Sequence, residues 1–249
     1  MFSETNIRKK GIEVCFSPAL FPFFNCHNKI VVIVDILRAT SVICSALDNG
    51  VKTVKPVAEV EEAFKLREAG YLVVAERNGM IVEGADLGNT PLIYTDGKYA
   101  GKSIALTTTN GTKAIEVAKG HENKIIIGSF LNFSTLVNWL TDQDDDILIL
   151  CAGWKNHFNL EDTVFAGAVI EKLINSGNFS TICDSAIASL ELFYKAKNDI
   201  FYFIKDSSHF KRLEKLNLID DIKYCLSFDK TNVLPILRNG DLGDLNKSN

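Results

Sequence analysis

Short apolar runs alternate along the chain with stretches in which apolar residues recur at the spacing of an α-helix. The apolar runs predict strands at residues 12–16, 30–35, 53–56, 72–75, 103–106, 124–128, 146–151 and 181–183. The helix-period stretches predict helices at residues 41–48, 60–69, 112–119, 131–140, 160–175 and 186–195. Continuously apolar strands indicate a sheet that is buried on both faces. We therefore predict an α/β fold, with a mainly parallel or mixed sheet and helices on both faces, in three layers.

The C-terminal part of the chain has a different pattern. From Lys195 onward the sequence is more charged, and HFKRLEKLNLIDDIKYCL predicts two short helices, at residues 209–216 and 219–226, before the polar ending GDLGDLNKSN. No linker rich in Pro, Gly or Ser, repeat or low-complexity tract separates this part from the rest. We therefore predict one domain over residues 1–249, in which residues 196–249 form a helical extension.

Composition narrows the classes of protein that fit. The 249 residues carry 27 basic and 31 acidic side chains, a formal net charge of −4, which argues against sequence-independent binding to nucleic acid. The longest apolar runs are far shorter than the roughly 18 residues that suggest a membrane span. The first residues lack the pattern of a signal peptide. Six scattered cysteines without a C-x-x-C pair are interpreted as reduced, buried thiols, and we expect a cytoplasmic protein.

Acidic and basic residues follow two of the predicted strands, where open α/β sheets bind their ligands. Asp35 ends the strand at 30–35 and Arg38 follows three residues later, while Glu76 and Arg77 follow the strand at 72–75. A carboxylate can bind a hard cation, and an arginine can bind phosphoryl oxygens through two N–H groups. The alternative for the first pair is a structural ion pair between Asp35 and Arg38.

Polar residues also follow two other strands. The turn Thr107-Thr108-Thr109-Asn110-Gly111-Thr112 leads into a helix, and helix N-termini suit anions because they present free N–H groups. The strand at 146–151 precedes Glu161 and Asp162, which could complete a metal site with acids from neighbouring strand ends. The alternative for both segments is helix capping, since Asn159 can cap the second helix and the helix dipole favours acids in its first turn. The loop Gly84–Pro91 contains Asn89 and is either part of the site or a compact loop.

The histidines carry less information than these loops. His157 precedes the acidic pair and is a weak candidate for an acid or base, whereas His27, His121 and His209 lie in polar or charged surroundings that are typical of surface residues.

Together the loops favour a site for a phosphorylated small molecule and a divalent cation. Several phosphatase mechanisms are excluded because their motifs are absent. No cysteine precedes an arginine in the C-x₅-R spacing, Leu37 stands where a D-x-D motif beginning at Asp35 would need an acid, and R-H-G does not occur. Attack by water with the help of a metal ion remains.

The segments VDILRATSV, AERNGMIVEGADLGNTP, TTTNGTKA and AG…LED closely resemble those of the 2-phosphosulfolactate phosphatase family in order and spacing. The resemblance extends over about residues 10–237 and includes SSHFKRLEKLNLIDDIKYCLSFDKTNVLP. It implies an α/β fold and a Mg²⁺-dependent phosphatase that hydrolyses (2R)-2-phospho-3-sulfolactate to 3-sulfolactate in coenzyme M biosynthesis. The stretch WKNHF, residues 154–158, differs from the Gly-rich segment that family members often have there.

From the residues and the resemblance we expect the following roles, with direct in-line attack by a Mg²⁺-activated water and no phosphoenzyme. Asp35, Arg38 and Asp162 are the expected catalytic residues, and Asp35 or Asp162 would accept the proton of the water. The expected metal ligands are Asp35, Glu76, Glu161 and Asp162. The expected substrate-binding residues are Arg77, Asn89, Thr108, Asn110, Gly111 and Thr112. Arg38 and the Thr108–Thr112 turn would hold the phosphoryl group, while Arg77 and the backbone of residues 84–89 would meet the sulfonate and carboxylate.

Two other functions stay open at this point. One is a protein that binds a phosphate ester or another anion without turnover, and the other is a phosphatase for a related small phosphorylated acid. The four acids favour an enzyme, because a binder of a dianion would be expected to lack them. We expect a small phosphorylated sulfonate as the partner, with no nucleic acid and no membrane; a homodimer remains open.

Overall fold

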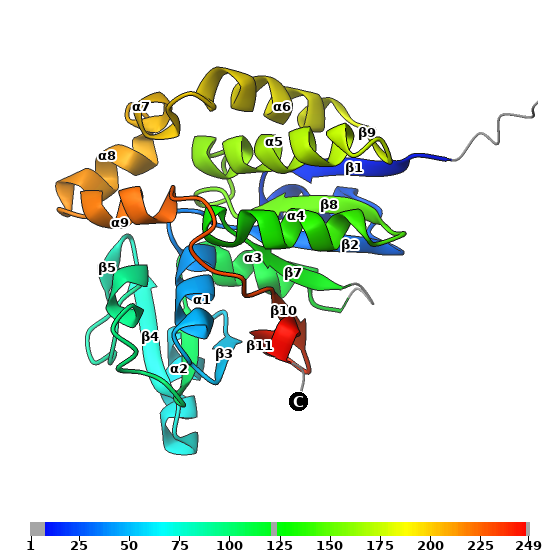
Figure 1. Cartoon of the computed structure of the whole chain (residues 1–249). Coiled ribbons are helices and arrows are strands. Elements are labelled where there is room, and N and C mark those ends of the chain that lie inside the picture. The colour runs from blue at the N-terminus through cyan, green and yellow to red at the C-terminus, as the bar shows by residue number, and fades with distance from the viewer. Residues whose placement is uncertain (1–7, 121–123, 248–249) are drawn as a thin grey trace, which may run out of the picture.

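One sheet runs through the molecule. In the computed structural model, which describes residues 8–120 and 124–247, the strand order is β5-β4-β6-β3-β11-β10-β7-β2-β8-β1-β9 (Figure 1). The strands are β1 (Lys10–Cys15), β2 (Lys29–Val34), β3 (Thr53–Pro56), β4 (Leu72–Arg77), β5 (Met80–Ile81), β6 (Ser103–Thr107), β7 (Ile125–Gly128), β8 (Asp146–Cys151), β9 (Phe179–Thr181), β10 (Pro235–Arg238) and β11 (Asp241–Asp244).

Helices connect most of these strands. They are α1 (Ala39–Asp48), α2 (Val60–Leu66), α3 (Gly111–Ala118), α4 (Phe133–Thr141), α5 (Leu160–Asn175), α6 (Asp184–Ala196), α7 (Ile200–Ile204), α8 (Ser208–Lys215) and α9 (Ile219–Cys225). Short 3₁₀ helices lie at Pro18–Phe23, Arg67–Ala69, Pro91–Tyr94, Phe130–Asn132 and Leu245–Lys247.

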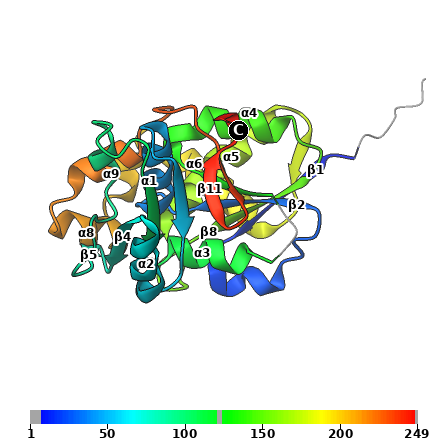
Figure 2. The ribbon, with the colours of Figure 1, turned by 90° about the horizontal axis from the view of Figure 1, so that it is seen from below.

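The sheet consists of two parallel groups that a hairpin joins. In the first group β7, β2, β8, β1 and β9 are parallel to their neighbours. In the second group β3, β6 and β4 are parallel, and β5 pairs antiparallel with β4. The hairpin β10–β11 lies between the groups and pairs antiparallel with both, through Ile236 and Ile126 on one side and Leu242 and Val54 on the other (Figure 2).

Helices cover both faces of the first group. Alternate residues of a strand point to opposite faces. Ile30, Val32 and Val34 of β2 therefore join a buried cluster with α4, α5 and α6, whereas Val31 and Ile33 join another with α1 and α3. This confirms the predicted α/β fold with helices on both faces of a mixed sheet.

The second parallel group is thinner, and α1 connects it to the first. Val73, Ala75 and Ala105 pack with Ala63 of α2 in a small cluster of their own. The opposite face of these strands, which includes Leu106, belongs to the cluster that contains α1 and α3. Because α1 begins just after β2 and packs against strands of both groups, it connects the carboxyl end of β2 to the second group.

The observed ends of the helices and strands agree closely with those predicted from the sequence. The bounds of β3, β8 and α5 are those predicted, and most other predicted elements differ by one to three residues at their ends. The predicted helix at 60–69 finishes as a 3₁₀ turn. The predicted strand at 181–183 begins earlier, at Phe179, because it pairs with β1 from Lys10 onward.

The C-terminal part departs from the predicted helical extension. The helices α7, α8 and α9 are present, but the segment after α9 contributes the hairpin β10–β11 to the middle of the sheet. Its turn, Asn239-Gly240, has positive φ at both residues, 52° and 85°, which is the turn geometry that Asn-Gly favours in two-residue hairpins. This dipeptide was the sequence signal for the hairpin.

Two further observations concern the state of the cysteines and the character of the described helices. All six cysteines are free, and all but Cys183 are buried; burial raises the pKa of Cys15 and Cys225 to about 12. Among the described helices, none has the length and apolar character that would let it cross a membrane.

Candidate active site

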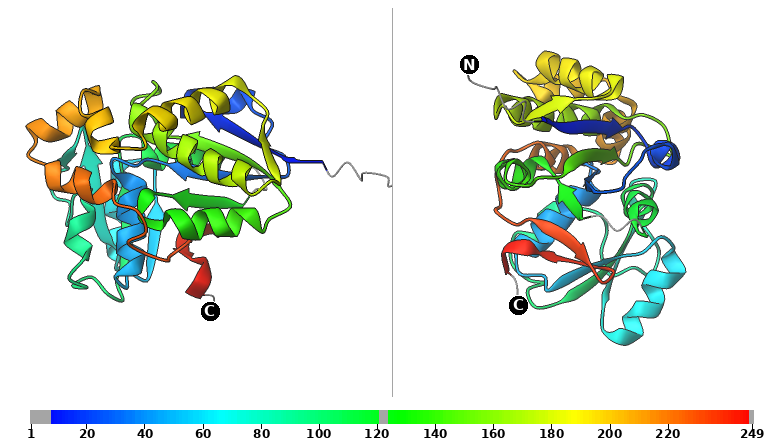
Figure 3. Two further views of the ribbon diagram at one scale, coloured as in Figure 1. Left: turned by 45° about the horizontal axis from the view of Figure 1, so that its top comes forward. Right: turned by 90° about the vertical axis from the view of Figure 1, so that its right-hand side faces the viewer.

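A small cavity lies where the carboxyl ends of the two parallel groups meet. Its volume is about 20 Å³, enough for about one water molecule or ion. Its wall combines residues that follow β2, β4, β6 and β8 with two residues of α8, which packs beside β4 and β5 (Figure 3). The lining residues are Asp35, Leu37, Arg38, Glu76, Gly79, Asn89, Asn110, Trp154, His209 and Leu213. The structure thus brings the four predicted strand-end loops together.

Asp35 is the buried acid at the end of β2. Its Oδ1 accepts a long hydrogen bond from the N–H of Ala39 (3.4 Å), and Oδ2 makes none with the described residues. Burial raises the pKa of Asp35 to about 6; the charges of Glu76 and Glu161 act in the same direction, and His209 opposes them. A carboxyl with this pKa can accept or release a proton near neutral pH.

Gly111 lets the N-terminus of α3 approach Asp35. A Cβ atom at this position would lie 2.7 Å from Asp35 Oδ2 and 2.5 Å from Ala39 Cβ, so any larger residue would force the two elements apart. The positive end of the α3 dipole therefore lies against the carboxylate, where it favours negative charge.

Asp162 is fully buried and bonds to the backbone around it. Its Oδ1 accepts from the N–H of Ile36 (2.8 Å), and its Oδ2 accepts from Asn159 Nδ2 (2.8 Å) and from the N–H of Gly153 (3.3 Å). Burial raises the pKa of Asp162, and the charges of Asp35 and Glu161 add to this effect. With both oxygens engaged, Asp162 holds the segments after β2 and β8 in place.

Glu161 is also fully buried, but one of its oxygens is open. Oε1 accepts from Asn159 Nδ2 (3.1 Å) and lies 2.5 Å from His209 Nδ1. Oε2 is buried and has no hydrogen-bond partner among the described residues. Asn159 stands at the N-cap position of α5, yet its side chain does not cap the helix and donates to the two carboxylates instead.

Glu76 and Arg77 stabilise a tight hairpin. Asn78 and Gly79 have positive φ, 56° and 87°, and turn the chain from β4 into β5. The carboxylate of Glu76 accepts from the N–H of Gly79, from Thr109 Oγ1 (3.0 Å) and from the N–H of Thr109 (3.2 Å). Arg77 donates to Glu76 O (2.7 Å), Thr107 Oγ1 (2.9 Å) and Ala58 O (3.2 Å). Arg77 is thus held in the fold and is not among the residues that line the cavity. Its contact with substrate stays a prediction.

The threonine turn is held together by its own hydroxyls. The N–H of Thr108 donates to Thr112 Oγ1 (3.1 Å), the N–H of Thr112 donates to Thr108 Oγ1 (3.2 Å), and Thr112 Oγ1 donates to Thr108 O (3.1 Å). The Thr112 hydroxyl, which was predicted to donate to the phosphoryl group, donates within its own turn in this structure. Asn110 does line the cavity; its Oδ1 accepts from the N–H of Lys155 (2.8 Å), which leaves Nδ2 free to donate. Asn89 also lines it, with a buried Oδ1 that has no hydrogen-bond partner among the described residues.

Arg38 lines the cavity and forms a buried ion pair with Asp221 of α9, so the proposed pairing with Asp35 does not form. The second oxygen of Asp221 accepts from Thr90 Oγ1 (2.6 Å), and Arg38 Nη2 donates to Gly79 O (3.4 Å). Asp221 was not among the site residues predicted from the sequence. Its signal was an acid on the apolar face of a helix, since Leu218, Asp221, Ile222 and Cys225 follow the i, i+3, i+4, i+7 spacing.

His209 is a second missed residue, and the structure corrects its predicted place at the surface. It is 7% exposed, lines the cavity and contacts Glu161. The signal was again an apolar helix face, which His209 shares with Phe210 and Leu213. His157 is exposed, with Nδ1 2.9 Å from Lys155 O, and it does not line the cavity. His27 is exposed as predicted, and His121 lies outside the described residues.

Two acids could bind a cation at the site: Asp35, which lines the cavity, and Glu161, which does not line it but has a buried oxygen without a partner among the described residues. Among the described residues no group of three or more His, Cys, Asp or Glu side chains is placed to enclose a metal ion. Asp35 and Glu161 each keep an oxygen without a hydrogen bond, whereas both oxygens of Glu76 and of Asp162 are engaged. Mg²⁺ commonly binds through one or two carboxylates and retains several waters, so the donor set fits this ion.

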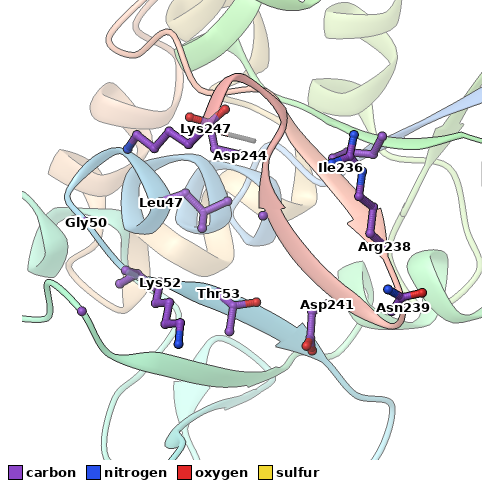
Figure 4. A pocket seen from close by; sticks show the side chains of 13 residues that line it. Leu47, Gly50, Lys52, Thr53, Ile236, Arg238, Asn239, Asp241, Asp244 and Lys247 are labelled. Atoms are coloured by element: carbon purple, nitrogen blue, oxygen red, sulfur yellow. The ribbon is translucent and has the colours of Figure 1, made fainter. Parts of the chain in front are cut away.

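A larger cavity, of about 700 Å³, lies away from these residues (Figure 4). It is bounded by the hairpin β10–β11 and the segment before β3, with Lys52, Thr53, Arg238 and Asp241 on its walls. None of the predicted site residues lines it. Size alone would favour this cavity, but the buried acids and the carboxyl ends of the strands place the candidate active site at the smaller one.

Comparisons with known proteins show the family of this chain. A family profile described as 2-phosphosulpholactate phosphatase matches residues 15–240. A protein named "Probable 2-phosphosulfolactate phosphatase" from Caldanaerobacter subterraneus subsp. tengcongensis is 42% identical over 217 residues, which cover 86% of this chain and 89% of the relative. Proteins of the same name from Thermotoga petrophila and Clostridium acetobutylicum are 44% and 38% identical, over 84% and 86% of this chain and 89% and 92% of their own lengths. The chain therefore belongs to the 2-phosphosulfolactate phosphatase family of phosphoric monoester hydrolases.

Proposed function

We propose that this protein hydrolyses 2-phospho-3-sulfolactate to 3-sulfolactate and phosphate, with Mg²⁺ as its cofactor. Family membership supports the substrate. The observation that carries the proposal is the buried Asp35, which lies against the N-terminus of α3 and shares one cavity with Arg38. A proton acceptor, an anion-binding helix end and an arginine are together what hydrolysis of a phosphate ester requires.

The phosphoryl group would lie between Arg38 and the start of α3. Asp221 holds one end of the Arg38 guanidinium, and the remaining N–H groups can donate to phosphoryl oxygens. Asn110 can donate through Nδ2, and the first backbone N–H groups of α3 add the attraction of a helix N-terminus. These donors would stabilise negative charge on the phosphoryl oxygens in the transition state.

Mg²⁺ would be held by Asp35 and Glu161, the two acids that keep an open oxygen. When bound, the ion supplies a Lewis acid that neutralises phosphoryl charge and lowers the pKa of water. Glu76 and Asp162 would instead hold backbone segments of the site in place. Glu76 fixes the turn after β4, and Asp162 fixes the segment after β2 from which Asp35 and Arg38 emerge.

Asp35 is the better placed of the two predicted proton acceptors. Both oxygens of Asp162 already accept hydrogen bonds from N–H groups, so Asp162 has no open position for a water. Asp35 has one, and its pKa of about 6 suits proton transfer near neutral pH. Oδ2 of Asp35, which has no hydrogen bond with the described residues, would both contact the cation and accept the proton of the attacking water.

Phosphate release from 2-phospho-3-sulfolactate tests the proposal. We expect turnover by the wild-type protein with Mg²⁺ and none by Asp35→Asn, while Asp220→Asn, which removes an exposed acid that pairs with Lys223, keeps wild-type activity. Tight binding of the compound without phosphate release would instead support the anion-binding alternative. Faster turnover of another small phosphorylated acid in a panel would support a phosphatase for a related substrate.

A further inference from the structure

Arg212 of α8 has buried nitrogens that lack a partner. Its guanidinium carbon lies 3.9 Å from the centre of the Trp154 ring. Nε and Nη2 are both buried, yet neither has a hydrogen-bond partner among the described residues, and no acid lies within salt-bridge distance of Arg212 in that part of the chain. A buried donor without an acceptor is unfavourable, more so when the group is charged. The described residues thus leave two donors of this guanidinium unsatisfied.

The position of Arg212 connects it to the candidate active site. Trp154 and His209 both line the cavity, and their rings lie 5.4 Å apart. Arg212 follows His209 by three residues on α8, so the two share a side of the helix, and Arg212 stacks on the same Trp154 ring. Trp154 is turned back toward the site by a tight turn at Lys155 and Asn156, which have positive φ and close a bridge between Trp154 and His157.

The other arginines near the cavity are already engaged. Arg77 donates three hydrogen bonds inside the fold, and Arg38 is paired with Asp221 at the expected phosphoryl position. A substrate with a second strongly acidic group needs a further cation. The open donors of Arg38 are assigned to the phosphoryl group, so Arg212, with two nitrogens that have no partner among the described residues, is the arginine left beside the cavity wall for the second acidic group.

We propose that Arg212, held against Trp154, binds the sulfonate of the substrate and so selects sulfonated phosphate esters. A guanidinium can donate two parallel hydrogen bonds to two oxygens of such a group. The ring of Trp154 fixes the plane of the guanidinium and contributes a cation–π contact. This inference rests on the proposed function and gives Trp154 and Arg212 a role in specificity.

One competing role for Arg212 is structural. Burial lowers the pKa of Arg212 and the nearby charge of Glu161 opposes this effect, so Arg212 could serve as a counter-charge for that acid. The two roles differ in one respect. A counter-charge would affect the hydrolysis of every substrate, whereas a sulfonate site affects only substrates that carry a sulfonate.

The test compares two substrates that differ in the sulfonate alone, 2-phospho-3-sulfolactate and 2-phospholactate. In Arg212→Gln we expect kcat/KM for the sulfonated substrate to fall about 10- to 100-fold, chiefly through KM, since hydrogen bonds to charged groups have this strength. The value for 2-phospholactate should change by less than about threefold, because that substrate does not reach Arg212. Inhibition by the product 3-sulfolactate should weaken in parallel.

Two further variants serve as controls. Lys211→Gln removes the neighbouring charge on α8, which pairs with Asp206 at the surface, and should leave both substrates unaffected. Arg212→Lys keeps the charge and the packing on Trp154 but loses the paired donors, so it should show a smaller, still sulfonate-specific loss. It also keeps the test usable if Arg212→Gln does not fold.

The outcomes separate the inference from the proposed function. Wild-type turnover of 2-phospho-3-sulfolactate tests the function, and the ratio between the two substrates in the variants tests the sulfonate site. Equal losses on both substrates would assign Arg212 to Glu161, and no loss on either would exclude contact with substrate; each result overturns the inference while the function stands. If the wild-type protein hydrolyses neither compound, both fail.

Discussion

Arg38 and Asp221 are 183 positions apart in the sequence, yet their side chains form a buried ion pair beside the cavity. Arg38 lies just after β2 and Asp221 belongs to α9, so the pair attaches the C-terminal helices to the carboxyl end of β2. Thr90 fixes Asp221 from a third segment through a hydrogen bond of 2.6 Å. The orientation of the arginine thus depends on chain segments that lie far from it in the sequence.

Asp221→Asn should lower both stability and activity. Removal of one partner from a buried ion pair destabilises a protein by about 3–5 kcal/mol, because the other charge stays buried and unpaired. Without its anchor the Arg38 guanidinium should also lose its orientation, so kcat/KM should fall at least about tenfold. Urea unfolding and steady-state kinetics measure the two effects. Thr90→Val is the matched control, since it removes the other hydrogen bond of Asp221 and leaves the ion pair; equal effects of the two variants would refute the positioning role.

Arg38→Lys separates charge from geometry at the same pair. A lysine can keep the contact with Asp221, but its single ammonium cannot also present paired donors to a phosphoryl group. We expect a smaller loss of stability than in Asp221→Asn, together with a fall in kcat/KM of about tenfold or more. Unchanged kinetics would assign Arg38 to a purely structural ion pair.

Asp35 should make the folded state less stable as the pH rises. Its pKa is raised from 3.8 to about 6, so the folded protein binds this proton more tightly than the unfolded chain does. The contribution of Asp35 to stability is therefore greatest below pH 4 and is lost as the pH rises through 6, with a difference of about 3 kcal/mol by linkage.

Asp35→Asn tests this pH dependence, because the asparagine side chain cannot ionise. In the presence of a chelator it should raise the free energy of unfolding at pH 7.5 by up to about 3 kcal/mol. In a separate assay with Mg²⁺ it should abolish turnover. Urea unfolding of both proteins between pH 4 and pH 8 gives the comparison, and the exposed Asp220→Asn is the control for loss of one charge. If wild type and Asp35→Asn respond to pH alike, Asp35 does not carry this dependence.

The sequence places the strand-end loops well because a general rule governs them. Parallel strands present their carboxyl ends at one edge, so Asp35, Glu76 and Asn110 could be expected near one another without knowledge of the fold. The rule does not give the orientation of a side chain. Arg77 stands beside Glu76 in the sequence but bonds back to the backbone, and the hydroxyl of Thr112 is used within its own turn.

Asp221 and His209 could not be placed in the same way. Their surroundings depend on how α8 and α9 pack against β4, β5 and the loop at Thr90, which is a matter of tertiary contacts between distant segments. A polar residue on an apolar helix face indicates that it is buried, but it does not identify the partner. The hairpin β10–β11 was missed for a different reason, because its short strands are surrounded by glycine and aspartate, and only Asn239-Gly240 marks them.

Removal of metal should abolish activity if Mg²⁺ is the cofactor. Protein freed of metal and kept in excess chelator should lose turnover, and Mg²⁺ should restore it. Binding to the folded state should also raise the free energy of unfolding, by about 2.7 kcal/mol at a concentration one hundred times Kd.

Two variants locate the ion. Glu161→Gln removes an acid with an open oxygen and should weaken the Mg²⁺ response about tenfold. Glu76→Gln alters an acid whose oxygens are occupied, and it should change the stability of the β4–β5 turn more than the affinity for Mg²⁺. Full turnover by metal-free protein in chelator would exclude the cofactor.

The mechanism makes a prediction about stereochemistry at phosphorus. Hydrolysis of phosphate monoesters is among the slowest of uncatalysed reactions, and enzymes accelerate it by up to ~10²¹-fold. Positioning of the reactants accounts for roughly 7–11 kcal/mol of such an effect, so activation of the water and stabilisation of phosphoryl charge must supply much of the rest. Asp35 is suited to take the proton of the water, since burial has raised its pKa to about 6.

The same carboxylate could instead attack phosphorus and form an acyl phosphate, and the two routes differ in configuration. A single in-line displacement by water inverts phosphorus, whereas two displacements through a phosphoenzyme retain its configuration. We expect inversion when a substrate with a chiral, isotopically labelled phosphoryl group is hydrolysed in ¹⁸O-water, with the configuration of the phosphate read by ³¹P NMR. Asp35 does not begin a D-x-D motif, since Leu37 follows it by two residues, and no cysteine has the C-x₅-R spacing of phosphoenzyme mechanisms. Retention would therefore point to Asp35 itself as the nucleophile and would replace its role as proton acceptor.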